Sequence, residues 1–287
     1  MRHCPAIAPR VVTLSVTQRL AAGAPRPQYQ WVTVETAGHF VNAIRWGNIA
    51  DVRDLLFAEP ELATSRIHGG RAALHVATDW PGYFPNGPEI VDMLIRAGAD
   101  PNARTDKGNG ETPLHWAAST DDVDVADVLI EAGGDVEAPD GSIGTPLDNA
   151  IGYACWHVAR RLVEAGAAIN KLWHAAALGH LTRLDELLSA DPAPTGDEVN
   201  EAFWQACHGG QFRAAQRLLE RGPDLNYHPG YAENRPVEIC RRGRYPTAAT
   251  GGMARSPRRA ANSMTTGRRV DGDGRLPSIK RYLGPAR

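Results

Sequence analysis

One unit recurs six times along the middle of this chain, and no other feature limits the possible folds as much. Its clearest copy begins at Thr112-Pro113-Leu114-His115 and continues as a helix-forming stretch, a polar turn and a second helix-forming stretch. The six copies have their first anchor at residues 40, 74, 114, 147, 172 and 203. Such spacings are typical of arrays in which every repeat is one supersecondary unit.

A second register supports this repetition independently. The second helix-forming stretch of each copy has apolar residues at i, i+3 and i+4, which is one face of a helix. These sets are Val52/Leu55/Leu56, Val91/Leu94/Ile95, Ala126/Leu129/Ile130, Ala159/Leu162/Val163, Leu184/Leu187/Leu188 and Ala215/Leu218/Leu219. Four of these stretches end at Gly98, Gly133, Gly166 and Gly222, where glycine permits the left-handed turn that follows a helix. Each copy therefore predicts a helix–turn–helix that covers its apolar face only by stacking on its neighbours.

Local chemistry in the clearest copy agrees with this interpretation. Thr112 can cap the first helix with its hydroxyl, and Pro113 suits the first helical position because no amide donor is needed there. Leu114, Ala117 and Ala118 share one helical face. The two small alanines allow a neighbouring helix pair to approach closely.

Residues 36–242 resemble an array of ankyrin repeats. The Thr-Pro-Leu-His motif at 112–115, the 33-residue step to Leu147 and Gly-Ala-Asp-Pro-Asn at 98–102 are specific to that family. The resemblance implies an all-α repeat solenoid of about six ankyrin-type helix-turn-helix repeats joined by short hairpin loops, with irregular N- and C-terminal extensions. It also implies that the motif histidines, His75 and His115, are structural and form hydrogen bonds within and between repeats.

The later copies depart from the family pattern. Asp148, Trp173 and Trp204 replace the motif histidine, and the 25-residue step from the fourth to the fifth copy leaves no room for a normal hairpin. A proline-containing connection, residues 190–203, replaces the usual loop before the sixth copy. We therefore expect irregular junctions from the third to the fifth copy. A seventh copy begins at residues 235–237 and then loses the pattern.

Charge divides the chain into three segments. Residues 1–34 carry a net charge of +4 and residues 243–287 carry +8, which leaves −14 for residues 35–242. We predict an irregular basic N-terminal segment (1–34), a repeat array (35–242) and an Arg-rich disordered tail (243–287). Because the seventh copy stops where a capping helix is needed, we interpret the tail as an out-of-frame reading of a GC-rich gene. Residues 1–34 also lack a pattern, and translation from a misassigned upstream start codon would explain them.

Catalytic and metal-binding motifs are missing from the sequence. It has no nucleophile elbow, phosphate-binding glycine loop, HExxH or dinucleotide fingerprint, and the four cysteines form no CxxC pair. His157, His174, His180 and His208 fall on different copies, so structural or exposed histidines are favoured over metal ligands. The acidic run Asp121, Asp122, Asp124 and Asp127 lacks the spacing of a calcium loop and suits the start of a helix. We predict a non-enzyme without cofactor or metal.

The remaining general predictions concern compartment and assembly. The sequence has no apolar run of membrane-spanning length and no secretory leader, so we expect a soluble, cytoplasmic, monomeric protein. The excess of Arg over Lys suggests a GC-rich, bacterial genome.

One segment, residues 79–85, lengthens the turn inside the second copy by five residues and contains Trp80, Tyr83 and Phe84. Insertions of this kind map to loops that often bind partners, and aromatic residues dominate binding hot spots. These rings could form a rigid contact patch, or they could fold over the edge of the first copy as a local core. The sequence leaves both interpretations open.

The resemblance further implies a binding surface on the concave side of the array. Carried over by position, and joined by Tyr83 and Phe84 of the inserted loop, the candidate partner-binding residues are Arg71, Asp79, Trp80, Arg104, Lys107, Glu111, Ser119, Thr120, Tyr153 and His208.

The leading functional hypothesis is a non-catalytic protein-protein interaction scaffold with a protein partner on this surface. An alternative is binding of nucleic acid or an acidic partner through the Arg-rich termini, although these lack stacking aromatics and the acidic middle would repel phosphates. A second alternative is a regulatory subunit of an enzyme on another chain.

Overall fold

The computed structural model describes residues 33–106, 110–232, 234–236 and 238–239. The chain divides into a unit of Met1–Trp31, which lies outside the described residues, and a unit of Val32–Arg287 that contains all of them. The predicted tail, 243–287, and nearly all of the predicted N-terminal segment, 1–34, lie outside the described residues. The first helix begins at Val34, one residue from the predicted start of the array.

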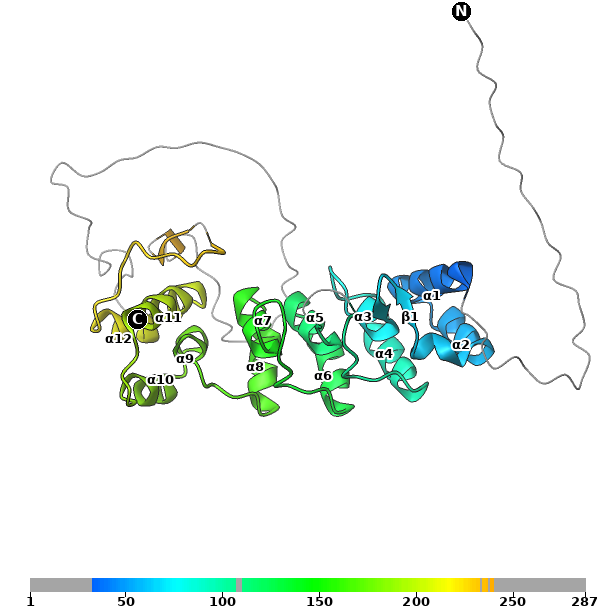
Figure 1. Cartoon of the computed structure of the whole chain (residues 1–287), viewed down its shortest axis with the longest axis horizontal. Helices are drawn as coiled ribbons and strands as arrows, with labels where there is room; N and C mark the ends of the chain where they lie inside the picture. Colours follow the sequence, from blue (N-terminus) through cyan, green and yellow to red (C-terminus); the bar gives the residue numbers. More distant parts are fainter. Residues whose placement is uncertain (1–32, 107–109, 233, 237, 240–287) are drawn as a thin grey trace, which may run out of the picture. The chain divides into compact units, whose positions relative to one another are not determined.

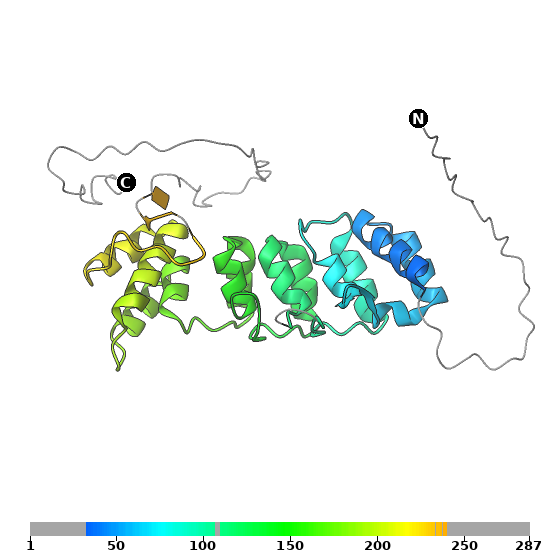
Figure 2. The same ribbon diagram turned by 45° about the horizontal axis from the view of Figure 1, so that its top comes forward.

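Twelve α-helices form six antiparallel pairs within the described part of the chain, and successive first helices lie side by side (Figures 1 and 2). The pairs are α1 (Val34–Trp46) with α2 (Ile49–Ala58), α3 (Ala73–Ala77) with α4 (Gly87–Arg96), α5 (Pro113–Thr120) with α6 (Val123–Glu131), α7 (Pro146–Gly152) with α8 (Trp156–Glu164), α9 (Leu172–Leu178) with α10 (Leu181–Leu188), and α11 (Gly196–His208) with α12 (Phe212–Leu219). The predicted helical repeat fold is confirmed.

Short non-helical elements occur only between the first two pairs in the described segments. A 3-10 turn, η1 (Pro60–Ala63), precedes a small antiparallel hairpin of β1 (Arg66–His68) and β2 (Arg71–Ala72). This hairpin lies in a connection between two helix pairs and adds two short strands to the all-α repeat fold that the sequence predicts.

The turns inside the helix pairs use one repeated device. A residue with left-handed backbone ends the first helix, and the next residue begins the second helix as its N-cap. Gly47 (φ 69°) precedes Asn48, whose side chain accepts from Asp51 N, and Asp121 (φ 59°) precedes Asp122, whose side chain accepts from Val125 N. Such caps satisfy amide donors that have no partner within the helix.

The second helices end as the sequence predicts. The glycines after α4, α6, α8 and α12 all have positive φ: Gly98 at 98°, Gly133 at 87°, Gly166 at 102° and Gly222 at 71°. A Cβ atom disfavours this conformation, which explains the recurrence of glycine.

The core lies between the stacked pairs. One cluster of buried apolar residues runs through α1–α8 and reaches Ala177 of α9, and a second fills α9–α12. Leu74, Leu114, Leu147, Ala117 and Ala118 are all almost completely buried. The small residues allow the close packing of first helices that the sequence predicts.

The motif histidines connect each copy to the next. His75 Nε2 donates to Glu111 O at 2.9 Å, and His115 Nε2 donates to Gly144 O at 3.0 Å. The amide of Thr112 donates to His115 Nδ1 at 3.1 Å, which places the ring proton on Nε2. The predicted structural role of both histidines is confirmed.

In the fourth copy Asp148 occupies the motif position and makes a different connection. Its buried carboxylate accepts from Lys171 Nζ at 2.7 Å, from His174 Nε2 at 2.6 Å and from Thr145 N at 2.7 Å. Burial alone would raise the pKa of this carboxyl, but the hydrogen bonds from His174 and Lys171 outweigh it and lower the pKa to about 2.

In the fifth copy the prediction that Trp173 occupies the motif position is wrong. His174, not Trp173, is the third residue of α9, as His115 is of α5, and it is buried. His75 and His115 donate to the connection that follows their own copy, and the equivalent connection for His174, residues 189–195, has only seven residues. His174 Nε2 donates to Asp148 instead.

The sixth copy is built as the sequence predicts at the motif position. Trp204 Nε1 donates to Asn234 O at 2.8 Å and so replaces a motif histidine. The proline-containing segment before it becomes a seven-residue connection, 189–195, and an N-terminal extension of α11. Thr195 and Glu198 cap that extension reciprocally.

The burial of His75 predicts a specific pH dependence of stability. Burial lowers its pKa from 6.5 to about 4, so between these values the unfolded chain binds a proton that the folded chain does not. His75 therefore stabilises the fold fully above pH 6.5, and this contribution decreases as the pH falls towards 4, by about 3 kcal/mol in total. Urea unfolding at pH 7.5 and 4.5 should show a smaller pH dependence for His75→Gln than for the wild type. Replacing the exposed His157 by Gln is the control, and equal pH dependence in all three proteins would contradict the prediction.

The buried carboxylate of Asp148 predicts a large mutational effect. Asp148→Asn removes a buried charge that pairs with two cationic or hydrogen-bonding side chains, so we expect a loss of about 3–5 kcal/mol in the free energy of unfolding. Asp127, which pairs with Arg161 nearer the surface, is the matched control, and Asp127→Asn should cost about 1 kcal/mol or less. Urea unfolding measures both. Equal losses would mean that Asp148 does not hold the fourth and fifth copies together.

Candidate functional site

Several of the predicted partner-binding residues lie where a first helix turns into a second helix. Counting from the motif position, Trp80 of the second copy, Thr120 of the third and Tyr153 of the fourth are equivalent. In the first copy the residue at this place is Trp46, which precedes the left-handed Gly47 as Thr120 precedes Asp121. These positions line one edge of the array.

The connection from α3 to α4, residues 78–86, contains the inserted loop and is fixed to the first copy at both ends. Asp79 Oδ2 accepts from Arg45 Nη2 at 2.7 Å and from Arg71 Nη1 at 3.1 Å. Asn86 Nδ2 donates to Gly47 O at 2.9 Å. Two guanidinium groups thus share one carboxylate at the base of the loop.

At its other side the loop is fixed to the third copy. The amide of Tyr83 donates to Asp122 Oδ2 at 2.6 Å, and the Tyr83 hydroxyl donates to Asp121 O. A Cβ at Gly82 would lie 2.7 Å from the Thr120 Cβ, so the loop crosses Thr120 closely enough to require glycine. Tyr83 has a φ of 53°, which is uncommon for an aromatic residue and is held by these bonds.

Four aromatic side chains remain exposed along this edge, one for each of the first four copies. Trp46 is 78% exposed, Trp80 79%, Tyr83 63% and Tyr153 52%. We call these four residues the aromatic row. Tyr83 fills the place of the third copy because the loop carries it over Thr120. The two interpretations of the loop are resolved in part: its backbone packs on both neighbours, while Trp80 and Tyr83 face solvent.

Sequence reasoning missed Trp46. The first copy has no Thr-Pro-Leu-His motif, so its surface positions were not aligned with the others. The pairs Gly47-Asn48 and Asp121-Asp122, each a left-handed residue followed by an N-cap, were the signal that could have aligned them.

Glu111 and Arg71 are used inside the protein. The Glu111 carboxylate accepts from Trp116 Nε1 at 3.0 Å, Ser142 N at 2.9 Å and Asn149 Nδ2 at 3.3 Å. The Arg71 guanidinium carbon lies 4.7 Å from the centre of the Trp116 ring. These contacts join the second, third and fourth copies, which makes the inner face rigid.

Other predicted residues have similar internal roles. Arg104 Nη1 donates to Gly110 O and Pro139 O, both at 3.0 Å, and so holds two hairpin loops together. Ser119 Oγ donates to His115 O, and Thr120 Oγ1 donates to Trp116 O. Phe84 is half-buried. The hydroxyl groups of Ser119 and Thr120 and one terminal nitrogen of Arg104 thus make hydrogen bonds within the protein.

The last two predicted residues do not join this group. His208 is half-buried at the other end of the array, stacked on Trp204 at 4.8 Å and edge-on to Trp156 at 5.4 Å between ring centres. Burial lowers its pKa. Lys107 lies outside the described residues. The structure therefore brings together Arg71, Asp79, Trp80, Tyr83, Glu111, Ser119, Thr120 and Tyr153.

The electrostatic environment changes along the aromatic row. Near Tyr83, burial and the carboxylates of Asp121, Asp122 and Asp124 raise the pKa of its hydroxyl to about 12. Burial also raises the pKa of Asp122. Asp121 pairs with His157 at 2.7 Å, whereas Asp124 is exposed. The Tyr83 end of the loop is acidic, and the Asp79 end carries the two arginines.

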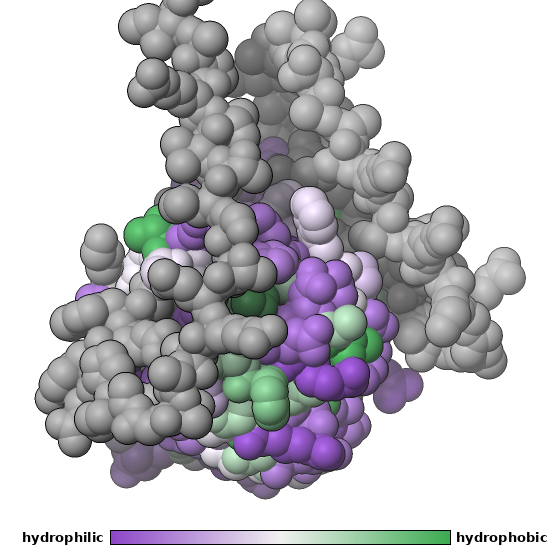
Figure 3. Space-filling model, turned by 90° about the vertical axis from the view of Figure 1, so that its right-hand side faces the viewer, coloured by the Kyte–Doolittle hydropathy of each residue, from purple (hydrophilic) through white to green (hydrophobic). Residues whose placement is uncertain are grey.

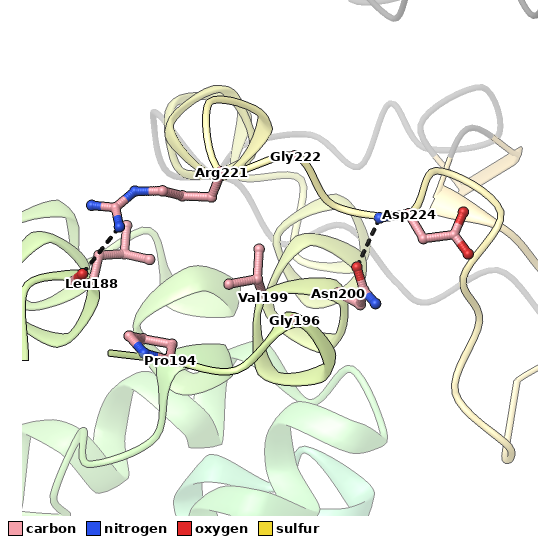
Figure 4. Close-up of a pocket in the computed structure, with 8 residues that line it drawn as sticks. All are labelled: Leu188, Pro194, Gly196, Val199, Asn200, Arg221, Gly222 and Asp224. Carbon is pink, nitrogen blue, oxygen red and sulfur yellow. Dashed lines mark hydrogen bonds between the residues drawn. The ribbon is translucent and has the colours of Figure 1, made fainter. Parts of the chain in front are cut away.

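A separate hollow of about 450 Å³ lies near the end of the array (Figure 4). Arg221 and Leu188 line one side of it, and Asn200 and Asp224 line another. Arg221 Nη1 donates to Leu188 O at 3.2 Å, and Asn200 Oδ1 accepts from Asp224 N at 2.7 Å. Its polar groups bind one another and do not converge on a common point.

The predictions about metal and membrane can be compared with the described residues only. Within them no three His, Cys, Asp or Glu side chains are grouped closely enough to hold a metal ion. His157 pairs with Asp121 and His174 with Asp148, so each has a protein partner. None of the described helices is both long and apolar enough to cross a bilayer. The cytoplasmic, bacterial and monomeric assignments stay predictions.

Comparison with known proteins agrees with this geometry. Glycerophosphocholine phosphodiesterase gde1 of Schizosaccharomyces pombe is 36% identical over 99 residues, which are 34% of this chain and 8% of the relative. Ankyrin repeat and KH domain-containing protein mask-1 of Caenorhabditis elegans is 28% identical over 149 residues, 49% of this chain and 6% of the relative. The neurogenic locus Notch protein of Drosophila melanogaster is 32% identical over 139 residues, 45% of this chain and 5% of the relative. The chain spans less than a tenth of each of these proteins.

The family comparison covers the centre of the array. Residues 74–171 match the family described as ankyrin repeats (3 copies). This range contains α3 to α8, with both motif histidines and Asp148. The flanking helix pairs have the same order of elements, and their assignment as further repeats of this family stays a prediction. Residues 74–171 are therefore a segment of ankyrin repeats.

Proposed function

We propose that this chain is a non-catalytic scaffold that binds a protein partner along the aromatic row and the adjoining inner face of the first four copies. Ankyrin repeats generally mediate interactions between proteins. The observation that carries the proposal is the row itself, four large aromatic side chains that are at least half exposed. Trp46, Trp80 and Tyr153 stand at equivalent positions of their copies, and Tyr83 of the inserted loop lies beside the third copy.

The row has the chemistry of a binding hot spot. Trp and Tyr contribute strongly to interfaces because they bury a large area with few rotatable bonds. The hydrogen bonds of Asp79, Tyr83 and Asn86 already fix the loop that carries two of the rings. A partner would therefore lose little binding free energy to ordering this loop.

The perturbed titratable groups support a non-catalytic role. The pKa values of His75, His115 and Asp148 are shifted, and shifted groups are often catalytic. Here each of the three makes a buried hydrogen bond between copies or within a cap. Their shifts follow from their structural positions. The negative charge of residues 35–242 would steer a partner with a basic surface towards the array.

Affinity capture with the full chain tests this proposal. We expect the wild type to capture a protein from lysate of cells that express the gene, and the double variant Trp80→Ala/Tyr153→Ala to lose it. Phe57→Ala is the matched control, because Phe57 is 91% exposed but lies on α2, outside the aromatic row.

Nuclease treatment of the lysate should leave the capture unchanged. Capture that depends on nucleic acid would favour the Arg-rich termini. Capture of the same protein by all three baits would place the binding surface elsewhere on the array.

A further inference from the structure

We propose that the aromatic row binds a proline-rich peptide segment in the polyproline II conformation, with a basic residue of the peptide beside Tyr83. This inference rests on the proposed function and names the chemistry of the partner. The row is exposed to solvent, and residues of three copies form it: Trp46 of the first, Trp80 and Tyr83 of the second, and Tyr153 of the fourth.

The spacing of the row selects the peptide conformation. Neighbouring packed helices lie about 8–10 Å apart, and the row has one ring for each successive copy. A polyproline II helix rises about 3.1 Å per residue with three residues per turn, so one side of it repeats about every 9 Å. A β-strand repeats about every 7 Å on one face and an α-helix about every 5.4 Å per turn. Of these three repeats, that of polyproline II is nearest to the usual spacing of packed helices.

The continuity of the row depends on the inserted loop. Thr120 would interrupt the series in the third copy, but the loop crosses it at Gly82 and places Tyr83 there. The Tyr83 hydroxyl donates to Asp121 O, which leaves the face of the ring exposed. Aromatic rings exposed in series are the surface on which proline-rich segments dock.

The indole N–H groups supply hydrogen-bond donors. A polyproline II backbone has no internal hydrogen bonds, so its carbonyl oxygens are free acceptors. The indoles of Trp116 and Trp204 are used within the array, on Glu111 and Asn234. Trp46 and Trp80 are nearly four-fifths exposed, and their indole N–H groups donate to no acceptor among the described residues.

Charge sets the direction of the peptide. Asp124 is exposed near Tyr83 and has no ion-pair partner within the described segments, and Asp121 adds a second carboxylate there. At the other end of the loop, Arg45 and Arg71 share the single carboxylate of Asp79. A basic residue of the peptide therefore fits the Tyr83 end and is repelled at the Asp79 end.

Fluorescence anisotropy with the full chain tests the inference. The probe is a labelled synthetic peptide of three Pro-Pro-Leu units followed by Arg, and the reference peptide has Ala in place of every Pro. We expect the proline peptide to bind, the alanine peptide not to bind, and Trp46→Ala or Trp80→Ala to weaken binding roughly tenfold. Phe57→Ala, which removes an equally exposed ring outside the row, should leave binding unchanged.

A separate variant tests the predicted contact between the basic residue of the peptide and Asp124. Asp124→Asn should weaken the arginine-terminated peptide several-fold and leave a proline peptide without Arg unaffected. Equal binding of the proline and alanine peptides, or no binding of the proline peptide, would overturn the inference. If a protein partner is still captured in a manner that depends on Trp80 and Tyr153, the scaffold function survives and only the peptide class is wrong.

Discussion

The array depends on buried hydrogen bonds that connect the third residues of the first helices α3, α5, α7 and α9 to a neighbouring copy. No copy can cover its apolar face alone, so stability comes from the contacts between neighbours. His75 and His115 donate to a backbone carbonyl of the following hairpin. His174 instead donates backwards to Asp148 of the preceding copy. The motif position can thus be occupied by His, Asp or Trp, provided that a polar atom of the side chain reaches the adjacent copy.

Local pattern was sufficient to predict the helices and their ends. The i, i+3, i+4 apolar sets and the glycines of positive φ both follow from the geometry of single helices, and the structure has them where the sequence places them. The motif position of the fifth copy is His174, whereas the sequence pattern predicted Trp173, one residue earlier. A short connection changes the register of the following helix, and apolar spacing on a helix of seven residues cannot detect so small a shift.

The binding surface was less predictable because side-chain contacts between distant residues decide it. Glu111 and Arg104 have the composition of contact residues, yet they join hairpins that are about thirty residues apart in the sequence. The inserted loop was expected to be either an exposed contact patch or a local core over the first copy, and neither interpretation describes it completely. Its backbone anchors on residues of the first and third copies, and those anchors leave Trp80 and Tyr83 exposed. A loop can be both structural and available to a partner.

The separation of the two apolar cores assigns different tasks to the two parts of the array. The aromatic row lies entirely on α1–α8 and their loops, which share one continuous core. That core fixes the spacing of the rings, as a linear peptide with a matching repeat would require. The second core begins at α9, and the Asp148–His174 pair with Lys171 lies at the junction. Apolar packing therefore determines the geometry of the candidate binding surface, and buried charge acts together with the packing of Ala177 of α9 to connect this surface to the rest of the array.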